Sequence, residues 1–379
     1  MSKFRIIDLF AGCGGLSHGF SGRDLSVVAS VEWDKACIDT IKANASRGHR
    51  HFHVDMRAYE DYLTASGGLR DIAENETIDG VVGGPPCQAY SLAGRIRCPD
   101  GMRDDYRNYL FEAYIEVLKT IQPKFFVFEN VIGMLSAKPG GVPVVERLAE
   151  AFESAGFTIP KIDKGIVFDL ADLGGPQYRK RVILFGINRS QYPDSSKRIN
   201  AFYSKLNASK TTHGNVLSVI GDLPKLFPLK HPESRKSHGF EPSDPLHIPR
   251  FHNARDIETF RLLASDAQLP EPKYRSIEKL KQLYTLKTGK TAAVHKYFVL
   301  YPDRPSNLIP AHLYKDGLRH IHYDPEQARS ITMREAARLQ TFPDAFKFVG
   351  SQTDIFKMIG NAVPPLMASK IAEAIKQVL

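Results

Sequence analysis

Residues 4–15 read FRIIDLFAGCGG, a short apolar run that ends in a glycine-rich turn. The same pattern returns in SVVASVE (26–32), IDGVVGG (78–84), KFFVFEN (124–130) and RVILFGI (181–187). Short, nearly continuous apolar runs are typical of parallel strands that are buried on both faces. Helical stretches separate these runs, and we expect helices over 34–43, 110–121 and 144–155. The first half of the chain therefore predicts an α/β fold with a doubly wound, mostly parallel sheet.

The regular alternation stops after Asn188, where a stretch rich in proline and histidine follows (HPESRKSHGFEPSDPLHIPRFHN, 231–253). It returns near Ser330, because ITMREAARLQTF (331–342) is typical of a helix. PPLMASKIAEAIKQVL (364–379) is typical of an amphipathic helix. We therefore expect a first domain over 1–189, a smaller irregular domain over 190–327, and a return to the first domain over 328–379.

The composition is that of a globular protein and excludes collagen-like, disordered and disulfide-framework chains. The 379 residues carry a net charge of +9, of which +7 lies between 190 and 327, where 21 Lys and Arg face 14 Asp and Glu. Nine of the 13 histidines lie there too. Such a segment is either an ordinary solvated surface or a face that binds nucleic acid.

The four cysteines form no CxxC pair, which argues against a zinc site, so we expect no metal. No apolar run approaches a membrane span, and MSKFRIIDLF has no signal-peptide pattern, so we expect a cytoplasmic protein without membrane contact.

Ligands of open parallel sheets bind beyond the carboxyl ends of the strands. Gly12, Gly14 and Gly15 follow the first run but lack the spacing of a phosphate-binding loop. Glu32 ends the second run, where an acid can bind ribose hydroxyls, and Trp33 could stack on an adenine or be a core indole. Asp34 could instead be an N-cap. Asp55, after a short run HFHVD (51–55), could accept a hydrogen bond from an adenine amino group. Together these positions predict a pocket for an adenosine without phosphates.

The later runs end in residues suited to catalysis. Cys87 follows two prolines and is either a nucleophile or a small buried hydrophobe. Glu129 follows an aromatic run, so its carboxyl could be desolvated and serve as a general acid, or be exposed at a strand end. Gln177, Arg179 and Arg181 alternate on one side of the last run, where arginines favour a thiolate or bind a phosphate or base carbonyl. Alternatively, they form a polar edge strand.

Seven segments, in this order, resemble the DNA (cytosine-5) methyltransferases of bacteria and phages. They are DLFAGCGGL (8–16), VEWD (31–34), GGPPCQAYS (83–91), FVFENV (126–131), QYRKRVILFG (177–186), REAARLQTFPD (334–344) and GNAVPP (360–365). The combination of PPCQ, ENV and QxRxR is far more specific than any one of these motifs.

The resemblance implies S-adenosylmethionine as cofactor, S-adenosylhomocysteine as product and double-stranded DNA as substrate. It implies catalytic roles for Cys87, Glu129, Arg179 and Arg181. It places thirteen residues at the cofactor: Asp8, Phe10, Gly12, Gly14, Gly15, Leu16, Glu32, Trp33, Asp55, Met56, Pro85, Asn361 and Val363. It places Gln88, Ser91, Arg95, Arg97 and Gln177 at the DNA, and residues 190–327 in the position of the target-recognition domain. We expect a nucleoid-associated monomer.

The family chemistry starts with attack of a thiolate on C6 of a flipped-out cytosine, followed by methylation of C5. Residues 91–109 contain four arginines and two glycines and are either a mobile loop that closes over DNA or a solvated linker. Three alternatives stay open: a tRNA cytosine-5 methyltransferase, a non-catalytic DNA-binding relative and a small-molecule methyltransferase. The sequence also leaves open the recognised site, and whether a restriction endonuclease encoded nearby is a functional partner.

Overall fold

The computed structural model describes residues 4–22, 24–56, 68, 77–86, 110–233, 235–239, 244–292, 296–315 and 317–379. Within these ranges, eight strands form one sheet in the order β3-β2-β1-β4-β5-β8-β6, with β7 also paired to β8. The strands are β1 (Phe4–Leu9), β2 (Leu25–Glu32), β3 (Arg50–His53), β4 (Gly80–Gly83), β5 (Phe125–Val131), β6 (Phe157–Thr158), β7 (Val167–Asp169) and β8 (Lys180–Asn188). The five predicted runs therefore all form strands.

The last long strand runs antiparallel to its neighbours in a sheet that is otherwise mostly parallel, as predicted. β1 to β5 are parallel, but β8 is antiparallel to β5, with Val131 opposite Arg181 and Glu129 opposite Ile183. β6 and β7 are also antiparallel to β8. The N-terminal end of β8 therefore lies beside the C-terminal end of β5, and brings the QYRKR segment to the edge where Glu129 lies.

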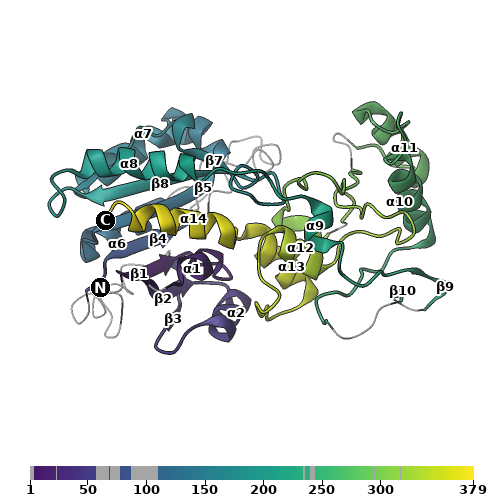
Figure 1. The fold of residues 1–379 in the computed structure, drawn as a ribbon, viewed down its shortest axis with the longest axis horizontal. Coiled ribbons are helices and arrows are strands. Elements are labelled where there is room, and N and C mark those ends of the chain that lie inside the picture. The colour runs from purple at the N-terminus through teal and green to yellow at the C-terminus, as the bar shows by residue number, and fades with distance from the viewer. Residues whose placement is uncertain are drawn as a thin grey trace.

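Helices cover both faces of the sheet, which confirms the doubly wound class (Figure 1). On one face, α6 (Leu110–Ile121) and α7 (Val144–Ser154) pack against alternate residues of β1, β4 and β5. On the other face lie α1 (Gly15–Phe20), α8 (Ser195–Ala208) and α14 (Pro365–Lys376). α2 (Lys35–Asn44) follows β2 and contacts β3.

The C-terminal helix joins the beginning of the chain as expected. Its predicted apolar face, Met367, Ile371, Ile375 and Val378, is buried against the sheet. α14 also packs along α1, which completes the first layer with residues from the far end of the sequence (Figure 1). The discontinuous organisation of this layer follows directly from that contact.

The predicted domain boundary after residue 189 lies before α8, a helix that packs on the sheet. Ile199, Phe202 and Leu206 of α8 are buried in the same cluster as Phe185 of β8. This helix is therefore part of the layer that covers the sheet, and the irregular part of the chain begins after Ala208.

The irregular part holds short helices around two smaller apolar clusters. Its elements are α9 (Val216–Ile220), β9 (Pro228–Glu233), β10 (Lys236–His238), α10 (Ala254–Asp266), α11 (Ile277–Thr288) and the 3-10 helix η7 (Ala311–Tyr314). α12 (Met333–Leu339) and α13 (Gln352–Asn361) connect it to the sheet, and α10 and α11 lie at the end of the molecule away from both termini (Figure 1). No helix in the described ranges is long and apolar enough to cross a bilayer.

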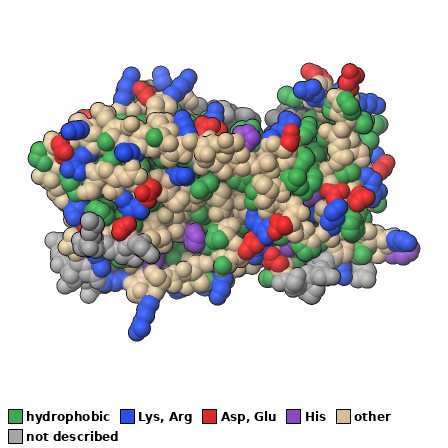
Figure 2. All heavy atoms as spheres, viewed as in Figure 1, with side chains coloured by type: hydrophobic (Ala, Val, Ile, Leu, Met, Phe, Trp, Pro, Cys, Tyr) green, Lys and Arg blue, Asp and Glu red, His purple; other side chains and the backbone are tan. Residues whose placement is uncertain are grey.

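Between residues 190 and 327, most of the histidines that the structure describes are buried. Figure 2 shows Lys and Arg side chains over both parts of the face in view. Of the eight described histidines between 190 and 327, five are buried: His238, His247, His252, His320 and His322. Burial lowers the pKa of His252, His320 and His322 to about 3, so these rings are neutral core groups. They do not contribute to a cationic face.

Candidate active site

The loop after β1 has a backbone shape that leaves room for a ligand. Phe10 and Gly12 both have a positive φ, of 54° and 55°, and the Phe10 conformation is costly for a residue with a side chain. A Cβ atom added to Gly12 would meet no atom of the described residues within 4 Å. The chain therefore turns sharply beneath an open space at the carboxyl end of β1.

Glu32 at the end of β2 holds this loop in place. Its carboxylate accepts hydrogen bonds from the backbone N–H of Gly12 at 2.8 Å, and of Trp33 and Asp34 at 2.9 Å. Burial raises the pKa of Glu32, and the three N–H groups oppose that shift. Glu32 thus lies where the first two strand ends meet, as the prediction of a cofactor-binding acid requires.

Trp33 and Asp34 are neighbours in the sequence but differ in their surroundings and contacts. Trp33 is 59% exposed, which excludes the alternative of a core indole and leaves its ring accessible for stacking. Asp34 is the N-cap of α2, since its side chain accepts hydrogen bonds from the N–H groups of Ala36 and Cys37. The N-cap alternative for Asp34 is therefore confirmed.

Asp55 and Met56 follow β3 on the far side of Glu32. The N–H of Val54 donates to the carbonyl oxygen of Glu32 at 3.0 Å, which keeps this segment beside the end of β2. Met56 is buried in the apolar cluster under the sheet, and Asp55 is half-buried. The Asp55 prediction therefore fits its location, whereas Met56 packs mainly in the core.

Asp8 and Leu16 lie beneath the loop. Asp8 is fully buried, and its Oδ2 accepts hydrogen bonds from the Ser17 hydroxyl at 2.6 Å and from the Ser17 N–H at 3.2 Å. Burial raises the pKa of Asp8 to about 7. Asp8 therefore fixes the first turn of α1, and through it the glycine-rich loop, instead of facing the open space itself.

The GNAVPP segment returns to this loop, as the resemblance implied. A Cβ atom on Gly15 would lie 2.2 Å from the carbonyl oxygen of Val363, so only glycine permits this close approach. Val363 is buried in this contact, and Asn361 is exposed at the end of α13. The DLFAGCGGL and GNAVPP segments are therefore in direct contact.

The catalytic edge is built on the paired strands β5 and β8. The Nε of Arg181 lies 2.7 Å from Oε1 of Glu129, and both side chains are about nine-tenths buried. A Cβ atom on Gly84 would lie 2.6 Å from Oε2 of Glu129, so the carboxylate lies against the segment that follows β4. Glu129, Arg181 and the GGPP segment are therefore neighbours, as predicted.

Asn130 ties the same two segments together. Its Nδ2 donates to the carbonyl oxygen of Pro85 at 3.3 Å, and its side chain is buried. Asn130 was not among the predicted site residues, although it lies inside the ENV motif beside Glu129. Its buried amide anchors Pro85, which lies two residues before the predicted nucleophile in the sequence.

Arg179 and Gln177 do not face this edge in the way that their alternation predicts. Arg179 is fully buried and donates from Nη1 to the carbonyl oxygen of Ile309 and from Nη2 to those of Gly360 and Ala362. Burial and the nearby guanidinium of Arg181 lower its pKa. In this position Arg179 fastens the GNAVPP segment to β8.

Gln177 is also fully buried. Its Nε2 donates to Oε1 of Gln340 at 2.6 Å, and its own Oε1 accepts from the N–H of Ile309 at 3.0 Å. A side chain enclosed by these partners does not face a bound nucleic acid, so we do not carry the predicted DNA contact of Gln177 further. Its physical role is to join QYRKR to REAARLQTFPD.

Five predicted residues lie outside the part of the chain that the structure describes: Cys87, Gln88, Ser91, Arg95 and Arg97. Pro85 and Pro86 are the last described residues before Cys87, and Pro85 is buried. The assignments of these five residues stay predictions from the sequence.

The open space at the ends of β1 and β2 suits an adenosine-containing cofactor without phosphates. It combines the open side of Gly12, an exposed indole at Trp33 and a buried acid at Glu32, and no basic side chain is among these three groups. The indole of Trp33 offers a surface on which the adenine ring can stack, and the carboxylate of Glu32 can accept hydrogen bonds from the ribose hydroxyls.

Comparison with known proteins identifies the family. The family model described as C-5 cytosine-specific DNA methylase matches residues 4–377. The chain is 34% identical to Type II methyltransferase M.Bpa9945I of Bacillus paralicheniformis, with 99% of both chains covered. It is 32% identical to Type II methyltransferase M1.HphI of Haemophilus parahaemolyticus, with 97% of this chain and 86% of the relative covered.

The fold has a counterpart among solved structures. A prophage-encoded E. coli protein assigned as a DNA modification methyltransferase superposes with a TM-score of 0.67 at 24% identity, and 99% of both chains is covered. That similarity supports the fold alone, whereas the match over residues 4–377 concerns the family. The chain belongs to the C-5 cytosine-specific DNA methylase family, which transfers a methyl group to cytosine in DNA.

Proposed function

We propose that this enzyme transfers a methyl group from S-adenosylmethionine to C5 of cytosine within a specific double-stranded DNA sequence, through a transient bond between Cys87 and C6. The observation that carries the proposal is the meeting of Glu129, Arg181 and the Gly84–Pro85 segment at one strand edge. This edge lies next to the loop of β1, across the parallel pair β1–β4. A base and a methyl donor held at these two places would be neighbours.

The proposed reaction begins at the pyrimidine. The thiolate of Cys87 forms a bond with C6, and the electron pair displaced from the C5–C6 double bond makes C5 nucleophilic. Glu129 protonates N3 or donates a hydrogen bond to it, which offsets the charge that develops there; positioned acid–base groups contribute about 10²- to 10⁴-fold.

C5 then forms its bond to the methyl group. Bound S-adenosylmethionine supplies that group on a positively charged sulfur, which leaves as neutral thioether. The C5 proton is removed by a base, the C6–S bond breaks, and the aromatic ring and the thiolate are restored. The target base must leave the helical stack first, at a cost of a few kcal/mol.

Three groups of residues support this chemistry from the protein side. Glu32 and Trp33 offer a hydroxyl acceptor and a ring surface for adenosine. Arg181 orients Glu129 and holds it close to the loop of Cys87. Arg179 fastens the returning GNAVPP segment, on which Asn361 and Val363 lie, to the catalytic strand.

The proposal is tested with a duplex that carries 5-fluorocytosine at a target mapped by base-resolution methylation sequencing. Fluorine at C5 blocks the final elimination, so the wild-type enzyme should become covalently attached in the presence of S-adenosylmethionine. Cys87→Ser should neither attach nor methylate, while Cys98→Ser, a matched change in the same stretch, should do both. Absence of the covalent complex in the wild type at a methylated target would overturn the mechanism.

Double-stranded DNA as the substrate is tested separately. Transfer of tritiated methyl groups to duplex DNA and to tRNA is measured side by side with the same enzyme preparation. We expect incorporation into DNA alone, and incorporation into tRNA alone would show that the substrate is wrong while leaving the Cys87 chemistry intact.

A further inference from the structure

A cavity of about 460 Å³ opens in the part of the chain that lies beyond the sheet. Its walls come from the start of α10, the end of α11, the η7 turn and the first residue of α13. This volume is within the ordinary range for sites that bind small organic groups. The cavity contains no residue of the strand edge described above, so it is a separate site.

Two of the lining residues are engaged in holding the walls together. Arg250 donates from Nη1 and Nη2 to the carbonyl oxygens of Leu313 and Tyr314, and its guanidinium lies 4.9 Å from the ring centroid of Phe356. His252 accepts a hydrogen bond from the N–H of Ser330. These contacts join the α10, η7 and α13 walls and make the cavity a built feature of the fold.

The other lining side chains combine aromatic surface with positive charge. Phe251 lines the cavity and is 51% exposed, so its ring is accessible to a ligand. Arg255 and Lys315 are also exposed there, and Arg255 shares its charge with Asp256 at 3.0 Å. Deeper in the wall, the rings of Tyr284 and Tyr297 lie 5.8 Å apart. An aromatic face beside two cations matches a planar base joined to a phosphate.

We propose that this cavity binds one nucleotide of the DNA substrate, with its base on Phe251 and its phosphate at Arg255 and Lys315. The inference rests on the proposed function, because it takes double-stranded DNA as the substrate. The carboxylate of Asp256 supplies an acceptor at the same place, which suits the exocyclic amino group of cytosine or adenine. The site would thus hold a nucleotide outside the target position.

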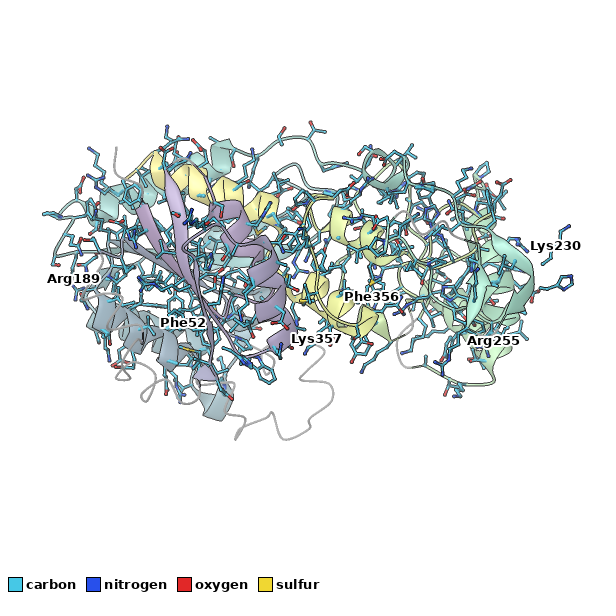
Figure 3. The ribbon with its side chains drawn as sticks, turned by 90° about the horizontal axis from the view of Figure 1, so that it is seen from below. Phe52, Arg189, Lys230, Arg255, Phe356 and Lys357 are labelled. Carbon is cyan, nitrogen blue, oxygen red and sulfur yellow. The ribbon has the colours of Figure 1, made fainter. Side chains whose placement is uncertain are left out.

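One helix, α13, contributes to the wall of this cavity and also contacts the proposed cofactor site. Gln352 in its wall begins α13, and Lys357 on the same helix lies 3.0 Å from Asp34, beside Trp33. Figure 3 shows Phe356 and Lys357 between the part that carries Phe52 and the part that carries Arg255. Helix α13 therefore extends from the wall of this cavity to Asp34, which lies beside Trp33 at the proposed cofactor site.

The test compares Phe251→Ala and Lys315→Ala with a matched control, Lys273→Ala. Lys273 lies 5.4 Å from the ring of its neighbour Tyr274, as Lys315 lies 5.9 Å from that of Tyr314, but Lys273 is not in the cavity wall. Binding of a fluorescent target duplex is measured by anisotropy at several salt concentrations. We expect Phe251→Ala to raise Kd about 10- to 100-fold, the usual effect of losing one base–aromatic stack.

Lys315→Ala should raise Kd less and lower the salt dependence of binding by about one phosphate contact. Lys273→Ala should change neither quantity and should keep the methyl-transfer rate of the wild type. Wild-type Kd values in Phe251→Ala and Lys315→Ala would overturn the proposal.

A second arm separates the two sources of a nucleotide. Free dCMP and dAMP at millimolar concentration are added as competitors of the duplex, and their binding to Phe251→Ala is measured as well. Mononucleotide binding that depends on Phe251, without any effect of Phe251→Ala on the duplex, would overturn DNA as the occupant. A wild type that binds duplex in the expected manner and methylates nothing would instead contradict the proposed function and leave this site standing.

Discussion

Two buried Glu–Arg pairs among the described residues, Glu129–Arg181 and Glu335–Arg329, differ in how their carboxylates are held, and only the first is part of the proposed catalytic site. Glu335 and Arg329 are both 1% exposed, and the two Nη atoms of Arg329 donate to the two carboxylate oxygens at 2.7 Å. The N–H of Thr332 donates to the same carboxylate. At the strand edge, Arg181 meets Glu129 through Nε, and the other carboxylate oxygen lies against Gly84. The carboxylate of Glu335 is therefore enclosed by hydrogen-bond donors, whereas Arg181 contacts one oxygen of the Glu129 carboxylate.

The difference lies in where each pair stands in the fold. Glu335 lies in the first turn of α12, in a capping box with Thr332, and the charge of Arg329 keeps its pKa well below the usual range against the effect of burial. That pair is committed to joining α12 to the irregular part of the chain. Glu129 ends a strand at the edge where parallel sheets bind their ligands. The same two residue types therefore serve stability in one place and chemistry in the other.

The sharpest way to break this comparison is Glu129→Gln. The amide keeps the shape of the side chain but cannot give a proton to N3, so turnover should fall by about 10²- to 10⁴-fold. The Kd for S-adenosylmethionine, measured by calorimetry, should stay within a factor of about two. A turnover close to that of the wild type would remove Glu129 as the acid.

Glu335→Gln makes the identical change in the enclosed pair and should have the opposite signature. It leaves the buried Arg329 without its counter-charge, which typically costs about 3–5 kcal/mol of folding free energy. Urea unfolding measures that loss, and turnover per folded molecule in the same preparation should be close to wild type. If Glu129→Gln proves the more destabilising of the two, the distinction between the pairs is wrong.

The sequence shows the strands of this fold better than their directions. A run such as RVILFGI is apolar on both faces, and such a pattern reads the same in a parallel and in an antiparallel strand. Its antiparallel pairing is set by contacts with β5 and β7 that no local pattern records. The predicted boundary lies before α8 for a related reason, because the apolar positions of this helix were visible but the sheet face that they cover was not.

The site residues divide in the same way. Glu32, Trp33 and Glu129 were predicted because each lies at or near the carboxyl end of its strand, and these strand ends meet at one edge of the sheet in this fold class. Arg179 and Gln177 were misread because alternation gives the side of a strand but not what covers it, and here 309, 340 and 360–362 cover it. Their partners lie 130 to 183 residues away in sequence. Asn130 was missed although it lies inside the FVFENV motif, and Ser17 was missed although it directly follows DLFAGCGGL.

The buried histidines make the free energy of unfolding depend on pH, and this dependence can be tested. His252 has a folded pKa of about 3 against about 6.5 when unfolded, so the unfolded state takes up a proton first as the pH falls. Stability is therefore lost below about pH 6.5, by up to about 1.4 kcal/mol per pH unit for this group, until about pH 3. His252→Gln keeps an acceptor for the N–H of Ser330 and does not titrate.

Urea unfolding at pH 7, 6 and 5 tests this expectation against the exposed His213→Gln as control. The difference in unfolding free energy between pH 7 and pH 5 should be about 2 kcal/mol smaller in His252→Gln than in the wild type. His213→Gln should retain the wild-type slope. An unchanged slope in His252→Gln would mean that the ring is charged in the folded protein.

The smallest expected effect concerns the partly exposed pair Lys357–Asp34. Asp34 caps α2 through Oδ1, whereas Lys357 contacts Oδ2, so Lys357→Ala leaves the cap in place. An ion pair this exposed contributes about 0–1 kcal/mol, and added salt should reduce that contribution further. Asp34→Ala removes the cap as well and should cost about 0.5–2 kcal/mol. In a double-mutant cycle, a coupling energy well above about 1 kcal/mol would show that this contact resembles the enclosed pair, and that α13 is bound to the cofactor edge more tightly than its exposure indicates.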